Sequence, residues 1–584
     1  MKALKYLNKY FFKYKYYFIF GTIITVFSKI LALAWPEIIG NSLDDVDAYR
    51  IDKSITLEEL KHILMINFLK IVGFAICSGF FTFLMRQTII VASRKIEFDL
   101  KNEIYNQYQL LSSSFYKQNR TGDLMNRISE DVSKVRMYFG PAIMYSINLI
   151  LLFVIAFTKM IQINEKLTLW TIAPMPILSI SIFVLSKVIN ERSQIVQRYL
   201  SKLTTLTQEV MSGINVIKSY GLEPQKEEDF NEMADQTRSK NVNLYKAQAL
   251  FFPLMVLLIG ISNIMVIYIG GMEYIEGNIG IGVIAEFTIY VNMLTWPVAA
   301  LGWVTSIIQQ AEASQKRINE FLEEVPEIQN KNEELTIIEG DIEFDQVSLK
   351  YPDTNIVAIQ NLSLKIKKGQ TVAILGKTGS GKSSILQLIS RLYDATSGVV
   401  KIDGEDIKDL NLYELRNSIG TVPQEPFLFS ESIADNIRFG KEDASLEEII
   451  AASKTAAIHE NIEGFKMGYD TILGERGVTL SGGQKQRVSI ARAIIKNPKI
   501  LLFDDCLSAV DTETEAQILQ GLNKVSKDRT AVIVSHRVSS AKNADFIYVL
   551  DQGQILEQGT HKELIQQEGF YKSLYDQQLL EKEF

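Results

Sequence analysis

The residues best suited to chemistry follow one short apolar segment in the second half of the chain. Residues 371–375 run directly into Gly376, Lys377, Thr378, Gly379, Ser380, Gly381, Lys382 and Ser383. This is the complete phosphate-loop pattern, Gly, four residues and Gly-Lys-Ser, in the strand-to-helix setting that the pattern requires. Glycines let backbone amides turn around phosphate oxygens, and the helix expected over 383–392 presents its positive N-terminus to the same anion. Lys382 supplies a mobile positive charge, and Ser383 a hydroxyl for Mg²⁺.

Further polar motifs follow expected strands and helices in the same half of the chain. Strands are expected over 418–422, 500–503 and 530–534, and they end at Pro423-Gln424-Glu425-Pro426, Asp504-Asp505 and Ser535-His536-Arg537. The segment Leu480-Ser481-Gly482-Gly483-Gln484-Lys485-Gln486-Arg487 opens an expected helix. Asp504, at the end of a buried strand, can hold the water shell of Mg²⁺ while phosphate oxygens complete the octahedron. Ser481 and the amides after it form a second anion site at a helix N-terminus.

Hydrophobicity divides the chain into two halves. Residues 1–320 contain the long apolar runs and are expected to form an α-helical transmembrane domain. The charged stretch 321–339, which includes Pro326, is expected to be a linker. Residues 340–584 are expected to form an α/β nucleotide-binding domain.

Six apolar runs are long enough to cross a bilayer, which takes about 20 mostly apolar residues. They are 16–36, 62–92, 139–163, 166–190, 248–273 and 283–309. Two long polar excursions, 95–137 and 190–245, are expected to extend the spanning helices beyond the membrane, each with a short helix at its tip near 121–127 and 213–218. Lysines are frequent before the first run and aspartates after it, so the positive-inside rule places the N-terminus and the nucleotide-binding domain in the cytoplasm. Lys29 is the strongest candidate among the charges within the spans for facing a central cavity.

Overall charge and cysteine usage exclude other classes. The net charge is only −7 with no basic stripe, which disfavours nucleic acid as a partner. Cys77 and Cys506 are far apart and lack metal-ligand spacing, so both are expected to be reduced residues of no special role.

Taken together, these motifs resemble the ATP-binding-cassette family, whose signature is Leu-Ser-Gly-Gly-Gln, and the membrane half resembles its exporters with six spanning helices per subunit. The resemblance covers nearly the whole chain. It implies ATP and Mg²⁺ as cofactors, an adenine-stacking role for Tyr351, and a metal- and water-sensing role for Gln424. It also implies that His536 reaches the γ-phosphate and that Ser383, Gln424 and Asp504 serve the metal. Further ATP-contacting positions implied by the family are Ser384, Ser481, Gly482, Gly483, Gln484 and Asp511.

The chain departs from the family pattern at one catalytic position. After the Mg²⁺ aspartate the family normally has a glutamate that activates the attacking water, whereas this chain has Asp505. The carboxylate is kept but is one methylene shorter, and general-base catalysis depends on reach. This resembles one subunit of the heterodimeric exporters, in which the partner supplies the glutamate and this chain the intact signature. The alternatives are a homodimer with two slower sites, or a neutral variant with near-normal turnover.

The leading hypothesis is therefore ATP-driven export of an amphipathic drug, lipid or peptide by a dimer of half-transporters. The expected location is a bacterial inner membrane, which the chain crosses several times. A homodimeric exporter or lipid flippase with slow hydrolysis is the first alternative. A regulatory ATP-binding membrane protein without transport is the second.

Overall fold

The computed structural model describes residues 2–51, 56–474, 477–506, 512–525 and 528–583. The chain forms two compact units, which are described separately. A helical unit comprises Met1–Gln107 and Gly122–Glu323, and a mixed unit comprises Tyr108–Thr121 and Glu324–Phe584.

The helical unit contains six helical segments that are long and apolar enough to cross a membrane. Within the described residues these cover Lys15–Ile51, Leu57–Leu110, Thr121–Ile163, Glu165–Ser212, Glu223–Ile275 and Ile281–Leu322. Each contains one of the six runs expected from the sequence, which confirms the number of candidate spans. The component helices are α1 (Asn8–Lys13), α2 (Lys15–Ala32), α3 (Trp35–Ile51), α4 (Leu57–Leu110), α6 (Thr121–Asn126), α7 (Val132–Met137), α8 (Ile143–Ile163), α9 (Glu165–Ile172), α10 (Pro174–Ser212), α11 (Ile214–Tyr220), α12 (Glu223–Ala249), α13 (Phe251–Ile275) and α14 (Ile281–Leu322), with a 3₁₀ turn η1 (Ala3–Leu7) and π turns η2 (Arg127–Asp131) and η3 (Tyr138–Ala142).

Two short helices lie near the tip of the first excursion: α6 (Thr121–Asn126), where a short helix was expected, and α5, which was not expected. The isolated short helix is α5 (Ser113–Gln118), whereas residues 121–127 begin the helix that returns toward the membrane. Extended backbone at Ser112 and at Asn119 separates α5 from its neighbours. Helix α6 continues through η2 and α7 into the third candidate span, so it is not a separate helix of the kind that α5 is.

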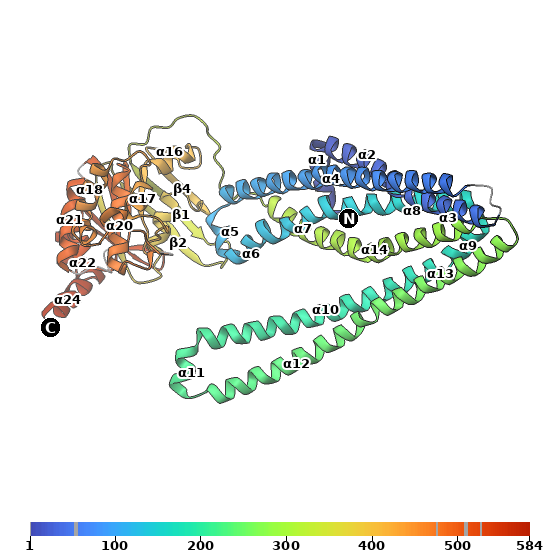
Figure 1. The fold of residues 1–584 in the computed structure, drawn as a ribbon. Coiled ribbons are helices and arrows are strands. Elements are labelled where there is room, and N and C mark those ends of the chain that lie inside the picture. Colours follow the sequence, from blue (N-terminus) through green and yellow to red (C-terminus); the bar gives the residue numbers. More distant parts are fainter. Residues whose placement is uncertain (1, 52–55, 475–476, 507–511, 526–527, 584) are drawn as a thin grey trace. The chain divides into compact units, whose positions relative to one another are not determined.

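The second excursion is a long antiparallel hairpin. Helices α10 and α12 run side by side and α11 lies at the tip, as the sequence predicted for residues near 213–218 (Figure 1). Gly221, in the left-handed region at φ 63°, ends α11. The tip exposes apolar side chains, with Met211 66%, Val216 60% and Tyr220 76% exposed.

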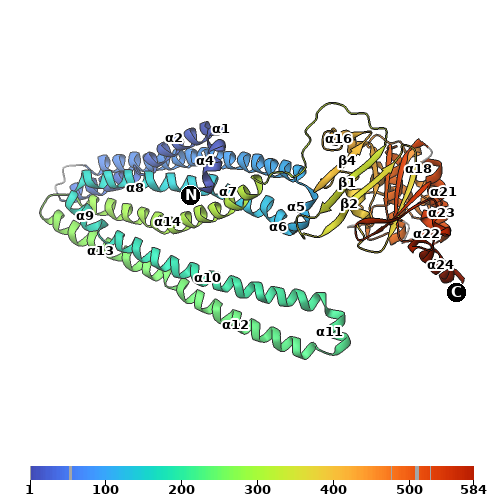
Figure 2. The same cartoon turned by 180° about the vertical axis from the view of Figure 1, so that it is seen from behind.

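The mixed unit contains two sheets (Figure 2). An antiparallel sheet has the order β2-β1-β4-β5, and a six-stranded sheet has the order β10-β9-β3-β8-β7-β6. The strands are β1 (Ile342–Lys350), β2 (Val357–Ile366), β3 (Thr371–Gly376), β4 (Ser397–Ile402), β5 (Glu405–Asp406), β6 (Ile419–Val422), β7 (Ile500–Asp504), β8 (Thr530–Ser535), β9 (Phe546–Asp551) and β10 (Gln554–Gly559). The helices are α5, α15 (Lys382–Ile389), α16 (Leu412–Asn417), α17 (Ile433–Arg438), α18 (Leu446–Thr455), α19 (His459–Glu463), α20 (Gly482–Ile495), α21 (Thr512–Val525), α22 (Val538–Ala541), α23 (His561–Gln566) and α24 (Phe570–Glu583), with a 3₁₀ turn η4 (Gly468–Asp470).

The centre of the larger sheet is parallel and buried. Strand β3 pairs in parallel with β8 and β9, and β7 pairs in parallel with β6 and β8. Strands with both faces covered read as continuous apolar runs, which explains why 371–375, 500–503 and 530–534 could be recognised from the sequence. The helical transmembrane domain followed by an α/β nucleotide-binding domain is thus confirmed as the fold class, while the boundaries at 320 and 339 stay predictions.

Candidate nucleotide site

The polar motifs meet at the carboxyl edge of the parallel strands. Leu375 at the end of β3 pairs with Ser535 at the end of β8, and Asp504 at the end of β7 pairs with Val534. In open α/β sheets, ligands bind in the crevice beyond this edge. The phosphate loop, Asp504, Asp505 and His536 therefore leave neighbouring strands at one place.

Two glycines of the phosphate loop have left-handed backbone angles and lie close to the backbone of neighbouring strands. Gly376 has φ 153° and Gly381 has φ 96°. A Cβ atom on Gly381 would lie 2.2 Å from the carbonyl oxygen of Ala358, and one on Gly376 would lie 2.4 Å from that of Leu550. A side chain at either position would displace the neighbouring strand, so these glycines hold the loop tight against the sheet.

Lys382 lies buried within the loop that it is expected to serve. Its Nζ donates hydrogen bonds to the carbonyl oxygens of Gly376 and Lys377, both at 2.8 Å. Burial lowers the pKa of Lys382 to about 8, and the carboxylates of Asp505 and Asp504 oppose that shift. The two carbonyl oxygens thus hold the Lys382 ammonium in the loop. Phosphate oxygens that enter the loop can replace them as its hydrogen-bond acceptors.

Ser383 and Asp504 provide the oxygen atoms that a Mg²⁺ ion needs. Ser383 Oγ donates a hydrogen bond of 2.8 Å to Asp504 Oδ1. Burial raises the pKa of Asp504, and the hydrogen bond from Ser383 acts in the opposite direction. Mg²⁺ is usually bound by one or two protein oxygen ligands, waters and substrate phosphates, so this pair fits the ion.

Asp505 is buried beside this pair, with a backbone in the left-handed region. It is 9% exposed and has φ 43°, and its amide donates to the carbonyl oxygen of Val534 at 2.9 Å. Asp is among the few non-glycine residues enriched in this conformation. The backbone of the position expected to hold the catalytic carboxylate is therefore fixed by the next strand. Cys506 after it is fully buried, as expected for a structural cysteine, and burial raises its pKa.

Tyr351 follows β1 and packs among polar and aromatic groups. Its hydroxyl lies 2.8 Å from Ser384 Oγ and donates to Gln387 Oε1 at 2.9 Å. Its ring meets that of Tyr393 edge to face, with centroids 5.1 Å apart. Lys117 of α5 places its Nζ 5.0 Å from each of these ring centroids. Lys117 and Tyr393 were not singled out from the sequence, because neither belongs to a motif and only tertiary packing brings α5 to these rings.

We predict that Tyr351→Ala raises the KM for ATP, whereas Tyr351→Phe leaves it within about threefold of wild type. Removing an aromatic ring that stacks on a base costs about 1–3 kcal/mol, or roughly 5- to 150-fold in affinity, and Phe keeps the ring. The measurement is ATPase activity over a range of ATP concentrations, with each substitution made in the Asp505→Glu background to provide a detectable rate. Tyr413→Ala is the control because that side chain is 67% exposed. An unchanged KM in Tyr351→Ala would contradict the assignment of Tyr351 as the adenine platform.

The signature motif lies at the start of α20. Ser481 is its N-cap, with Ser481 Oγ accepting from the amide of Gln484 and Gln484 Oε1 accepting from the amide of Ser481. Ser481 and Gly482 are exposed, and a Cβ atom on Gly482 would meet open space. The helix N-terminus is thus formed and open to an incoming anion.

Helix α20 also supports the loop that carries Gln424. Gln486, which is 2% exposed, donates a hydrogen bond of 3.0 Å from Nε2 to the carbonyl oxygen of Pro423. Gln424 itself is exposed in the loop after β6. The signature helix and this loop are therefore joined by one buried hydrogen bond. Asp511 lies outside the described residues.

His536 follows β8 and is half-buried. It is one of the groups that oppose the rise in the pKa of Asp504 that burial causes. The roles of Gln424, Asp505 and His536 in catalysis, and of the remaining residues in binding ATP and metal, stay predictions.

Comparisons with known proteins agree with this arrangement. A family model described as ABC transporter transmembrane region matches residues 18–298, and one described as ABC transporter matches residues 359–508. The chain is 36% identical over 580 residues to an uncharacterized ABC transporter ATP-binding protein, YknU of Bacillus subtilis, covering 99% of this chain and 98% of that protein. It is 34% identical over 559 residues to the multidrug resistance-like ATP-binding protein MdlA of Escherichia coli. This match covers 96% of this chain and 93% of that protein.

A solved structure with the same fold is that of a bacterial Atm1-family ABC exporter with ATP bound. It has a TM-score of 0.81 and 26% sequence identity, and the match covers 97% of this chain and 98% of that one. Both domains are therefore matched in a single protein, in the order seen here. The chain belongs to the ABC transporter family, as a multi-pass membrane exporter of the multidrug-like type whose ATP-binding domain is an ATPase coupled to transport.

Proposed function

We propose that this chain is one half of a heterodimeric exporter, in which its own ATP site hydrolyses slowly and its signature motif completes the active site of the partner. The observation that carries the proposal is Asp505 at the catalytic position, combined with an intact signature. The exposed Ser481 and Gly482 at the N-terminus of α20 suit this role, because an anion from another molecule can reach them.

The need for a second half-transporter follows from the family, whose exporters function as dimers. The tip of the α10–α12 hairpin supports it. Met211, Val216 and Tyr220 are exposed there, although large apolar side chains gain about 1.5–3 kcal/mol each from full burial. We infer that the partner covers this tip and that the hairpin transmits closure of the nucleotide-binding domains to the membrane.

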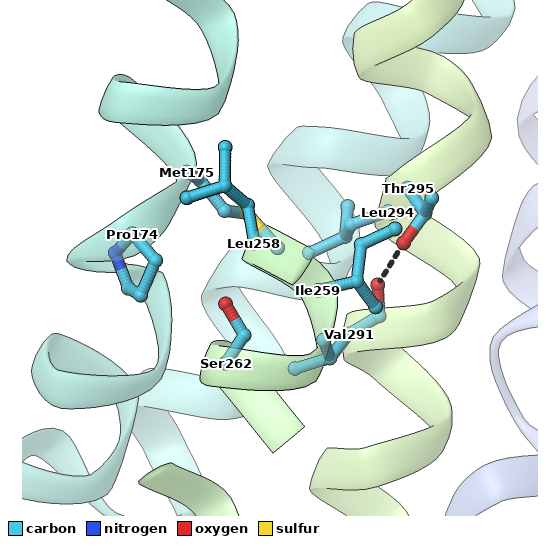
Figure 3. A pocket seen from close by; sticks show the side chains of 8 residues that line it. All are labelled: Pro174, Met175, Leu258, Ile259, Ser262, Val291, Leu294 and Thr295. Atoms are coloured by element: carbon cyan, nitrogen blue, oxygen red, sulfur yellow. Dashed lines mark hydrogen bonds between the residues drawn. The ribbon is translucent and has the colours of Figure 1, made fainter. Parts of the chain in front are cut away.

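The proposed substrate is amphipathic: a drug, a lipid or a peptide. An apolar pocket within the helical unit supports this class (Figure 3). Its lining comes from α10, α13 and α14, and comprises Pro174, Met175, Leu258, Ile259, Ser262, Val291, Leu294 and Thr295. None of these side chains is charged, and the Thr295 hydroxyl donates to the carbonyl oxygen of Val291 at 3.0 Å. The free space of about 10 Å³ is too small for a substrate, so the pocket supports this class only by showing that the interior between these helices is uncharged and mostly apolar.

The proposed mechanism is alternating access driven by nucleotide-dependent population shifts. Lys382 and the loop amides bind the phosphates, Tyr351 stacks on adenine, and Ser383 and Asp504 would hold Mg²⁺, with Gln424 as a further candidate ligand. The ion, when bound, neutralises charge that develops on the transferred phosphoryl group. Asp505 and His536 orient the attacking water and the γ-phosphate. The proposed location is a bacterial inner membrane, with the N-terminus and the ATP-binding domain in the cytoplasm.

The test is ATP hydrolysis and vesicle transport by the chain purified alone in lipid, followed by co-purification from the native membrane. We expect nucleotide binding with negligible turnover, and recovery of turnover when a glutamate-bearing half-transporter is added. Robust hydrolysis by the chain alone would instead support a homodimeric exporter or lipid flippase. Nucleotide-dependent closure without substrate movement, even with the partner present, would support a regulatory protein.

A further inference from the structure

The C-terminal helix α24 packs against the strands and loops that carry the ATP site. Tyr571 near its start is fully buried and belongs to a cluster with Leu375 of β3, Val538 of α22 and Val549 of β9. The Tyr571 hydroxyl lies 2.6 Å from His561 Nδ1, which joins α24 to α23. These contacts fix the position of α24 on the sheet.

One side chain of α24 bridges the loop that carries the switch histidine. Gln578 Nε2 donates to the carbonyl oxygen of His536 at 2.9 Å, and Gln578 Oε1 accepts from the amide of Val538 at 2.8 Å. A carbonyl can only accept and a backbone amide can only donate, so only one orientation of the Gln578 amide satisfies both. A single primary amide therefore holds the backbone on both sides of Arg537.

The same helix touches the phosphate loop. The ring of Phe570, the first residue of α24, lies 5.6 Å from Lys377 Nζ, within the range of a cation–π contact. Phe570 and Gln578 are separated by about two turns of the helix. Helix α24 thus contacts both loops that approach the γ-phosphate, although it contains no family motif.

We propose that Gln578 is a positioning residue for ATP hydrolysis, which sets the place of His536 by holding the backbone of residues 536–538. His536 can act on the γ-phosphate only if its imidazole is correctly placed, because small displacements of catalytic groups are costly. The side chain of Gln578 lies against the loop backbone and acts through His536. The C-terminal helix is thereby a part of the switch.

The test uses Gln578→Leu and Gln578→Glu in the full-length chain in lipid. Gln578→Leu removes both hydrogen bonds, whereas Gln578→Glu keeps the acceptor for the Val538 amide and loses the donor to the His536 carbonyl. Turnover is measured in wild type if it hydrolyses ATP alone, and otherwise in Asp505→Glu. Hydrogen exchange of residues 536–541 is measured in every variant, which keeps the test independent of the heterodimer proposal.

We expect Gln578→Leu to lower kcat about tenfold with the KM for ATP changed less than twofold, since the defect is in placement and not in nucleotide binding. Amide exchange at Val538 should become faster. In a His536→Ala background, Gln578→Leu should have no further effect on kcat, because residues that act through one another are not additive. Gln566→Leu is the control, as it changes an exposed glutamine of α23.

Three results would overturn the proposal. One is unchanged exchange at Val538 in Gln578→Leu. Another is that Gln578→Leu lowers kcat by the same factor in the His536→Ala background as it does when His536 is present. The third is an unchanged kcat in both Gln578→Leu and the milder Gln578→Glu, with only thermal stability lowered or the KM raised. That result would assign Gln578 a structural role only.

Discussion

Asp505→Glu is expected to raise the ATP turnover of the chain purified alone by about 10- to 100-fold. A well-placed general base contributes about 10²–10⁴-fold, and the extra methylene restores the reach that Asp505 lacks. The backbone at this position is held by the hydrogen bond from the Asp505 amide to Val534, so the longer side chain starts from a fixed point. The measurement is steady-state phosphate release in lipid at saturating ATP.

The controls separate reach from other effects of the substitution. Asp505→Asn keeps the size of Asp505 but removes the base, and it should not exceed wild type. Asp443→Glu makes the same chemical change at an exposed position and should leave turnover unchanged. Because Asp505 has φ 43°, a small loss of thermal stability is expected in Asp505→Glu, since Asp tolerates this region better than Glu. Rapid turnover in wild type with no gain in Asp505→Glu would show that the shorter acid suffices.

Lys382→Ala is expected to lower turnover by about 100-fold or more, measured in Asp505→Glu to provide a detectable rate. Removing one preorganised donor to developing negative charge typically costs about 10²–10³-fold in kcat. The Lys382 ammonium is already positioned in the loop by the carbonyl oxygens of Gly376 and Lys377. Binding of a fluorescent ATP analogue, measured alongside turnover, should weaken as well.

Lys367→Ala is the matched control for this prediction. It removes a lysine from an exposed turn of the same domain, before β3, and should leave turnover and nucleotide binding unchanged. Turnover that survives in Lys382→Ala would mean that the activity does not arise at this loop, and a contaminating ATPase would then have to be excluded.

The sequence alone determined the elements whose signals are local. The number of apolar runs, the phosphate loop and the signature can be recognised because each depends on neighbouring residues: continuous hydrophobicity, glycine spacing or an N-cap. The parallel strands before Gly376, Asp504 and Ser535 were found for the same reason, since burial on both faces makes them uniformly apolar. The short helix α5 (Ser113–Gln118) was not predicted from the sequence, although Ser112 and Asn119 at its two ends are typical turn residues.

Only the tertiary structure decided which side chains support these motifs. Gln578 is about 40 residues from His536, and Lys117 lies in a segment that precedes Tyr351 by more than 200 residues. Gln486 and Pro423 are likewise 63 residues apart in the sequence, with α17–α19 between them. Hydrogen bonds and ring contacts of this kind depend on where helices pack on the sheet, which no local pattern of residues encodes. The chemistry was thus evident in the motifs, whereas the groups that hold the motifs in place became evident only from the packing.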